Sequence, residues 1–357
     1  MPQTEIQRRL GLPHPIIQGP FGGGLSTVAL AAAVSNAGGL GSYGAHILEP
    51  DEIAPLVEAL RAATDGSIAL NLWVSDHDPG GDDFGAEAFD AVWPLFAPFF
   101  AEYGIERPEP PNRYHPRYAD QVEALLEARP DVFSFVFGIP DPAVLAACRQ
   151  RGIQTLGAAT TLAEAEALDA AGVDLILATG SEAGGHRPAF LEPAENNLIG
   201  TLPLTRQIAS RLRRPVIAAG GIADRSGIEA ALTLGAGAAQ LGTAFLACNE
   251  SGTHDAHRDI LFSDRARHTA LTRTYTGRLA RGIPNRVMAE MDKRAGQLPP
   301  FPVQAWFLGH LKRAALAAGD EDFASLYAGQ GAPLLKHRTV ADLMSDLTQP
   351  SPQPALA

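Results

Sequence analysis

The chain has 357 residues, of which 46% are hydrophobic and 19% charged, an ordinary composition for a globular protein with a large core. Its 40 acidic residues exceed its 28 Lys and Arg residues, giving a formal net charge of −12. An acidic chain without basic clusters excludes nucleic acid and anionic membranes as favoured partners. The apolar stretch nearest the N-terminus, residues 28–34, is also far too short to span a bilayer.

Cys148 and Cys248 are the only cysteines. Neither has the spacing of a metal ligand, and two thiols cannot form a disulfide framework for a chain of this length. Arg8 and Arg9 are followed by Gly-Leu-Pro rather than by an apolar segment, which argues against a twin-arginine signal. We therefore expect a reducing cytoplasm as the location.

A short apolar segment followed by a helix-like segment recurs along the chain. Each apolar segment is short and carries hydrophobic residues on both of its faces, as is typical of parallel strands covered on both sides. Thr161 and Asp224 are expected to cap two of the intervening helices, which Gly172 and Gly235 would end. The expected strands are residues 15–19, 40–43, 68–74, 132–137, 155–158, 175–178, 216–219 and 239–242.

About eight strands that alternate with helices predict an α/β protein with a closed (β/α)8 TIM barrel. A doubly wound open sheet is the alternative. The barrel would occupy residues 1–247, with an insertion at about 75–116 after strand 3 that forms a lid or pocket wall. Residues 248–357 would form a helical segment packed on the barrel, ending in a proline-rich tail.

His186 belongs to the segment Glu-Ala-Gly-Gly-His-Arg, residues 182–187, directly after the sixth expected strand. Parallel α/β enzymes place their chemistry at the carboxyl ends of strands, and an imidazole exchanges protons near neutral pH. An isolated loop histidine more often hydrogen-bonds a turn. The neighbouring strand ends therefore decide between the two interpretations.

Glycine-rich segments follow the seventh and eighth expected strands. Gly220 and Gly221 lie after one, and Gly242 and Thr243 after the other. A diglycine alone usually marks a tight turn. Two such loops at consecutive strand ends are typical of a phosphate site built from backbone N–H groups, so we expect a phosphorylated ligand.

Another glycine-rich loop, residues 18–24, follows the first expected strand. Its glycines form turns and also let a planar ring lie against the backbone. Asn71, in the third strand, offers an amide donor and acceptor to the edge of such a ring.

Three segments together resemble the nitronate monooxygenases, formerly called 2-nitropropane dioxygenases. They are residues 15–23, residues 180–186, and residues 219–224 with 242–245. Residues 276–281 extend the resemblance, and residues 133–140 with the long insertion resemble the class I branch of that family.

The resemblance implies an FMN-dependent barrel enzyme, a monooxygenase that uses O2 to oxidise alkyl nitronates or nitroalkanes to carbonyl compounds and nitrite. His186 would be the catalytic base. Thr276 would approach the flavin, and no nicotinamide would be required. The residues implied to bind FMN are Gly19, Pro20, Phe21, Gly22, Asn71, Gly180, Ser181, Gly185, Gly220, Gly221, Gln240, Gly242, Thr243 and Thr276.

Two other functions stay open at this point. The segment 182–186 also occurs in FMN-dependent enoyl-acyl-carrier-protein reductases and quinone reductases, which use NAD(P)H. A barrel that binds a phosphorylated ligand without flavin is the non-enzymatic alternative. The acidic residues of the insertion favour the longer monooxygenase branch and do not suit an NAD(P)H phosphate: Asp76, Asp78, Asp82 and Asp83.

The remaining polar candidates are expected to be structural. His254, His257 and His268 lack metal-ligand spacing and are expected to be solvated. Glu182 is expected to hydrogen-bond loop backbone. Tyr275, His77 and Arg278 are most simply surface or packing residues.

The sequence also bears on the substrate. Residues 300–302 and Trp306 stand where class I relatives carry tyrosines, which favours a more apolar substrate. A homodimer is compatible with the sequence.

Overall fold

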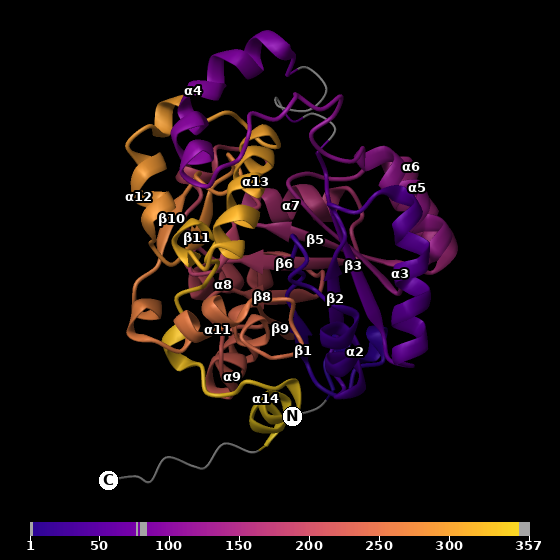
Figure 1. The fold of residues 1–357 in the computed structure, drawn as a ribbon. Helices are drawn as coiled ribbons and strands as arrows, with labels where there is room; N and C mark the ends of the chain where they lie inside the picture. The colour runs from indigo at the N-terminus through magenta and orange to yellow at the C-terminus, as the bar shows by residue number, and fades with distance from the viewer. Residues whose placement is uncertain (1–2, 76–77, 79–83, 350–357) are drawn as a thin grey trace.

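The computed structural model describes residues 3–75, 78 and 84–349, and shows a barrel of parallel strands surrounded by helices (Figure 1). The fold prediction is confirmed. The strands are β1 (Ile16–Gln18), β2 (Gly41–Gly44), β3 (Ile68–Trp73), β4 (Val132–Val136), β5 (Gln154–Ala159), β6 (Leu175–Thr179), β8 (Val216–Ala219) and β9 (Ala238–Leu241).

The strand order excludes the open-sheet alternative. Strands pair in the order β1-β9-β8-β6-β5-β4-β3-β2, all in parallel. The two ends of this order then meet, because Ile17 forms a parallel bridge with Leu40, just before β2. Backbone hydrogen bonds of 3.0 Å from Gln18 N to Leu40 O and of 2.9 Å from Leu40 N to Ile16 O close the barrel.

The barrel interior is filled by apolar side chains from strand after strand. Leu156, Leu175 and Ile217 are at most 2% exposed and form one cluster with residues of the N-terminal helix. That helix, α1 (Glu5–Leu10), contributes Ile6 to the cluster. The barrel interior is therefore a packed core, which leaves the carboxyl ends of the strands for function.

The outer helices begin where the sequence signals predict. The Thr161 side chain accepts a hydrogen bond from Glu164 N, and the Asp224 side chain accepts one from Gly227 N. These caps satisfy N–H groups that the helix itself cannot pair. The helices between barrel strands are α2 (Val28–Asn36), α3 (Pro50–Ala63), α5 (Tyr118–Ala128), α6 (Pro142–Arg151), α7 (Leu162–Ala170), α8 (Thr201–Arg211) and α9 (Arg225–Thr233).

The insertion after β3 forms helix α4 (Ala86–Glu102), which lies at the top of the molecule against the C-terminal segment (Figure 1). Phe96 of α4 stacks on Phe307 of α13 (Val303–Ala317), with ring centroids 4.2 Å apart and an interplanar angle of 7°. The insertion ends in residues 114–116, which form part of a cavity wall. Asp76, His77, Asp82 and Asp83 lie outside the described residues.

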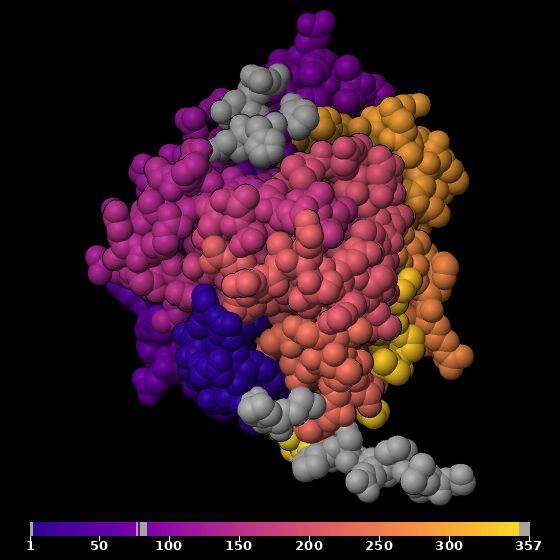
Figure 2. Space-filling model, turned by 180° about the vertical axis from the view of Figure 1, so that it is seen from behind, coloured from indigo at the N-terminus to yellow at the C-terminus, as the bar shows by residue number. Residues whose placement is uncertain are grey.

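The C-terminal segment is helical, as expected, but also contains two strands. Seen from behind, it lies along one side of the molecule (Figure 2). Helix α10 (Thr243–Leu246) follows β9 and precedes this segment. The elements of the segment are α11 (Asp255–Leu261), β10 (Ala270–Thr272), β11 (Ala280–Gly282), α12 (Arg286–Asp292), α13 and α14 (Val340–Thr348), with short 3-10 turns between them.

The last helix, α14, packs against α2 and α9, beside the junction of the first and last barrel strands. Its buried residues Leu343, Met344 and Leu347 join a cluster with Ile16 of β1 and Ala239 of β9. The proline-rich tail from residue 350 onward lies outside the described residues. Over the described part of the chain, every helix is too short or too polar to cross a bilayer.

Candidate active site

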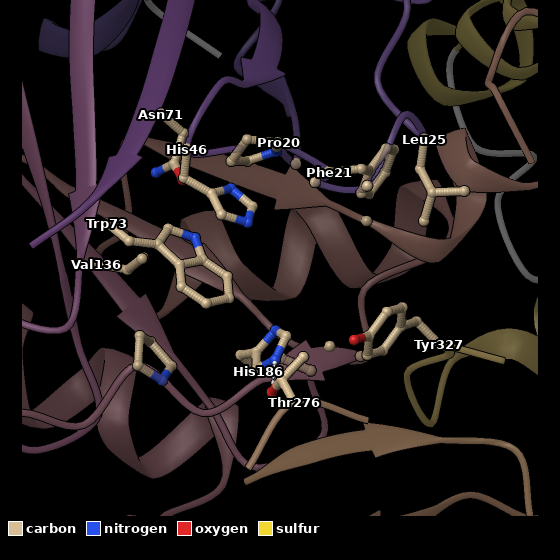
Figure 3. Close-up of a pocket in the computed structure, with 18 of the residues that line it drawn as sticks. Pro20, Phe21, Leu25, His46, Asn71, Trp73, Val136, His186, Thr276 and Tyr327 are labelled. Carbon is tan, nitrogen blue, oxygen red and sulfur yellow. Dashed lines mark hydrogen bonds between the residues drawn. The ribbon is translucent and has the colours of Figure 1, made fainter. Parts of the chain in front are cut away.

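A cavity of about 500 Å³ opens at the carboxyl ends of the barrel strands. Figure 3 shows residues from strand ends far apart in the sequence pointing into it, including Pro20, Asn71 and His186. The predicted site residues that line it are Gly19, Pro20, Phe21, Gly22, Asn71, Gly185, His186, Gly220, Gly221, Gln240, Gly242, Thr243 and Thr276.

His186 is held by a small sheet rather than by a free loop. Gly185 and His186 form the two-residue strand β7, which pairs antiparallel with β11, and β11 pairs with β10. Arg187 N donates to Leu279 O at 2.8 Å and continues the pairing. The C-terminal segment therefore fixes the backbone that carries the histidine.

The His186 ring makes one hydrogen bond within the described protein. Nε2 lies 2.8 Å from Thr276 Oγ1, as the dashed line in Figure 3 shows. The same hydroxyl oxygen accepts a hydrogen bond of 3.3 Å from Arg278 N. Since Nε2 is engaged, Nδ1 is the ring nitrogen left for a ligand.

His186 is neutral at physiological pH. Burial disfavours the imidazolium, the nearby positive charge of Arg278 disfavours it further, and together they lower the pKa of His186 to about 3. A neutral imidazole carries a lone pair, so the ring can accept a proton from a bound acid.

One wall of the cavity beside His186 is aromatic. The Trp73 ring lies edge-on to the His186 ring at 4.8 Å, and Phe137 lies edge-on to it at 6.2 Å. Phe137 ends the expected fourth strand one residue early, because its φ of 68° is left-handed and breaks the extended backbone. Phe301 packs on Trp73 at 5.1 Å and completes this wall.

His46 was missed by the sequence analysis. It follows β2, is 6% exposed, and stacks on Trp73 with ring centroids 4.0 Å apart and an interplanar angle of 6°. Its Nδ1 is buried without a hydrogen-bond partner among the described residues. Burial, followed by the charge of His115, holds the pKa of His46 well below its ordinary value. The position of this histidine just after a strand is the sequence signal that could have identified it as a site residue.

The opposite end of the cavity is lined by glycines. Gly220 and Gly221 have φ angles of 125° and 69°, so L side chains would be strained there. Gly242 has an ordinary φ, and a Cβ there would meet only Phe21, at 3.9 Å. Glycine at position 242 therefore leaves open space at the start of α10, on the side that lines the cavity.

A second feature missed by the sequence analysis is the segment 327–331, which crosses this glycine-rich end. Gly329 N donates to Thr243 Oγ1 at 2.9 Å, and Gln330 N donates to Glu182 O at 2.9 Å. A Cβ at Gly331 would lie 2.3 Å from Gly221 O. The Gly-Gln-Gly pattern was a signal for this close approach.

Gly180 and Ser181 do not line the cavity. A Cβ at Gly180 would lie 2.0 Å from Thr201 Oγ1, so the glycine allows β6 to approach α8. Ser181 O accepts a hydrogen bond of 2.9 Å from Arg281 Nε. In this structure both residues support the loop that leads to His186.

Glu182 is structural, as expected. Its carboxylate accepts hydrogen bonds of 2.8 and 2.9 Å from Thr201 N and Oγ1 at the start of α8. Arg187 is 1% exposed and donates to the backbone oxygens of Thr179, Gly180 and Asn197. These two residues fix the loop on either side of the glycines.

The expectation that His257 is solvated is wrong. His257 is 1% exposed, its Nε2 lies 3.1 Å from Tyr327 O, and burial lowers its pKa to about 3. His254 is partly buried and caps α11 by accepting from His257 N, and His268 is exposed. Within the described chain, no group of His, Cys, Asp and Glu residues is arranged to hold a metal ion.

Asn71, Tyr275 and Lys312 are three further polar residues that line the cavity. Asn71 is 4% exposed and its Nδ2 donates to Ser134 Oγ at 3.0 Å, which leaves its carbonyl oxygen for a ligand. Tyr275 is buried and its hydroxyl contacts Met288 Sδ, as expected of a packing residue. Lys312 of α13 forms no ion pair with any described residue, and burial lowers its pKa.

Comparison with known proteins identifies the family. The family model described as nitronate monooxygenase matches residues 4–350. The chain belongs to the nitronate monooxygenase family. It is 44% identical to the nitronate monooxygenase of Pseudomonas aeruginosa, covering 96% of this chain and 97% of that one. It is 42% identical to that of Paraburkholderia phytofirmans, covering 95% and 92%.

Solved structures agree with this assignment. Nitroalkane oxidase from Streptomyces ansochromogenes superposes with a TM-score of 0.86 at 36% identity, covering 96% of each chain. FabK from Thermotoga maritima superposes with a TM-score of 0.74 at 27% identity, covering 97% of this chain and 95% of that one. This member of the nitronate monooxygenase family is therefore an oxidoreductase.

Proposed function

We propose that this protein binds FMN and uses O2 to oxidise alkyl nitronates or nitroalkanes to carbonyl compounds and nitrite, with His186 as the base. The observation that carries the proposal is the neutral imidazole of His186, fixed by Thr276 and facing a cavity that has a glycine-rich end. A proton acceptor and an anion-binding end in one cavity suit a phosphorylated cofactor and an acidic substrate.

The residues present fit FMN. The open backbone at Gly242 and the hydroxyl of Thr243 would hold its phosphate beside Gly220 and Gly221. The loop at Gly19–Gly22 and the free carbonyl oxygen of Asn71 would accommodate the ring system. Bound FMN would supply the electron-transfer and oxygen chemistry that side chains lack.

The protein's own part in the reaction is to bind, orient and move one proton. We assign to His186 the Nε2–H tautomer, in which Nε2 donates to Thr276 Oγ1 and the lone pair lies on Nδ1. Nδ1 takes the α-proton of a neutral nitroalkane, and the resulting imidazolium pairs with the nitronate anion. A nitronate supplied as the anion needs no proton removal and uses the same imidazole only for orientation.

Nitrite release in air tests the proposal. The purified holoprotein should be yellow and should release nitrite from alkyl nitronates without NAD(P)H. His186→Asn should retain FMN and lose about 10²–10⁴-fold in turnover of neutral nitroalkanes, the usual contribution of a positioned base. The matched control is His268→Asn, since His268 is exposed. A His186→Asn variant with full nitroalkane activity would remove the base assignment.

The FabK likeness supports a second candidate, an FMN-dependent NAD(P)H oxidoreductase of the enoyl-acyl-carrier-protein or quinone reductase type. It is weaker because the nitroalkane oxidase is more similar in both sequence and structure. Anaerobic mixing with NADH separates the two. Fast bleaching of the flavin by NADH, with no nitrite from any nitronate in air, would favour the reductase.

A further inference from the structure

Arg278 and Asp78 form a largely buried ion pair next to the aromatic wall of the cavity. Their side chains are 16% and 10% exposed, and Arg278 donates from its terminal nitrogen to Asp78 Oδ1. The pair joins the turn between β10 and β11 to the segment that follows β3. Burial of two charges costs free energy, so this ion pair is expected to have a more specific role than a solvated surface pair.

The guanidinium of Arg278 lies against the aromatic wall. Its central carbon is 3.7 Å from the ring centroid of Phe137, 4.9 Å from that of Phe301 and 5.7 Å from that of Trp73. Two of these rings, Phe137 and Trp73, also lie edge-on to the His186 ring. The same two rings therefore contact both the guanidinium and the imidazole.

The backbone of Phe137 needs such support. A φ of 68° is strained in a bulky residue and persists only where the surroundings enforce it. Phe137 is 4% exposed, and the rings of Trp73 and Phe301 cluster with it. Arg278 makes the closest cation contact with this ring, so it helps to keep the strained residue in place.

Arg278 also reaches His186 by a second route. Its backbone N–H donates to Thr276 Oγ1, the hydroxyl that engages His186 Nε2. Arg278 therefore supports the His186 imidazole in two ways, through the hydrogen bond of Thr276 and through the rings of Phe137 and Trp73.

We propose that Arg278, held in place by its ion pair with Asp78, is a positioning residue that fixes the orientation of His186 and keeps a positive charge beside it. The proposal rests on the role of His186 as the base. Arg278 acts through Thr276 and the aromatic rings and does not itself line the cavity.

The charges around His186 give the proposal a measurable signature. His46 and Tyr327 are the titratable groups on neighbouring elements, Lys312 lines the same cavity, and Asp78 lies behind Arg278. Of these groups, Arg278 is the one whose charge lowers the pKa of His186, after burial itself. Removing the charge of Arg278 should therefore raise the pKa of His186.

Two substitutions separate charge from packing. Arg278→Gln removes the charge and the stacked guanidinium, whereas Arg278→Lys keeps the charge and loses the planar stack. Arg278→Gln should raise the acid limb of the kcat/KM profile by about one pH unit and lower kcat by about tenfold. Arg278→Lys should leave the limb in place and still lower kcat. Arg286→Gln is the control, because Arg286 pairs with Glu102 on the surface.

A readout without turnover uses the ring ¹⁵N shifts of His186 between pH 4 and 7, in protein with and without FMN. Arg278→Gln should show more imidazolium at pH 4 than the parent. Unchanged ring shifts together with an unchanged kcat would overturn the proposal. If the single variant does not fold, Arg278→Met combined with Asp78→Asn removes both charges and is read by the same shifts. Absence of nitrite from the parent would instead refute the proposed function, and the shifts would still test Arg278.

Discussion

His186 Nε2 lies 2.8 Å from Thr276 Oγ1, although 90 positions separate the two residues in the sequence. The contact depends on β7 pairing with β11, which brings the C-terminal segment to the strand end that carries the histidine. It also decides which imidazole nitrogen faces the cavity. The hydroxyl is thereby as much a part of the proposed proton-transfer site as the ring.

Thr276→Val should lower kcat for neutral nitroalkanes by about tenfold, because the ring loses the hydrogen bond that orients it. Thr276→Ser keeps the hydroxyl and should stay within about threefold of the parent. Steady-state nitrite release measures both, and the flavin absorbance shows whether FMN is retained. Equal rates for the Val and Ser variants would show that this hydrogen bond does not orient the base.

Gly242→Ala should weaken FMN binding while leaving the thermal midpoint of the FMN-free protein unchanged. The new methyl group has room in the protein itself but would occupy the proposed phosphate cradle. We expect a rise in Kd of tenfold or more, about 1.4 kcal/mol, in fluorescence titrations with FMN.

The comparison variant is Gly220→Ala. Its Cβ would lie 2.4 Å from Thr201 Oγ1 at a φ of 125°, so this variant should lower the thermal midpoint of the FMN-free protein as well. If Gly242→Ala bound FMN as tightly as the parent, the phosphate would have to lie elsewhere.

Glu182→Gln should destabilise the fold and leave the pH dependence of the reaction unchanged. The carboxylate stabilises the first turn of α8 through Thr201, and hydrogen bonds to a charged group contribute about 1.5–3 kcal/mol. Urea unfolding should therefore show a loss of about 1–3 kcal/mol. A displaced limb in the pH–rate profile would instead indicate that Glu182 takes part in proton transfer.

Stability should fall on acidification from about pH 6.5 towards pH 3. Burial lowers the pKa values of His186 and His257 to about 3, while an unfolded histidine titrates near 6.5. Between these values the unfolded state binds more protons, so the stabilisation present above pH 6.5 is lost as the pH falls. Each such group changes the unfolding free energy by about 1.4 kcal/mol per pH unit.

His257→Gln tests this linkage. The variant removes one titrating group, so a plot of unfolding free energy against pH should be less steep between pH 6 and 4. Urea unfolding at several pH values measures it, with His268→Gln as the exposed control. Equal slopes in parent and His257→Gln would show that His257 is not neutral in the folded protein.

Local patterns predicted the barrel well because each strand and each cap depends on neighbouring residues. The expected strand 216–219 matches β8 residue for residue, and Thr161 and Asp224 cap helices as expected. Phe137 shows the limit of such patterns. Its apolar side chain continues the strand pattern, but tertiary contacts hold its backbone in a left-handed conformation.

The parts of the site that escaped prediction all depend on distant contacts. The strand β7 is only two residues long and exists because β11 pairs with it. Burial of His257 depends on Tyr327, which lies 70 positions away. His46 gains its place by stacking on Trp73 of another strand. No periodicity within a short window carries this information.

The contact between Gly329 and Thr243 has a consequence for how the protein is made. All eight parallel strands lie within the first 241 residues, so they leave the ribosome while the rest of the chain is still being synthesised. The cavity gains its last wall only when residues 327–331 emerge and Gly329 N reaches Thr243. A ligand that needs that wall is therefore captured at the end of synthesis, after the scaffold has formed.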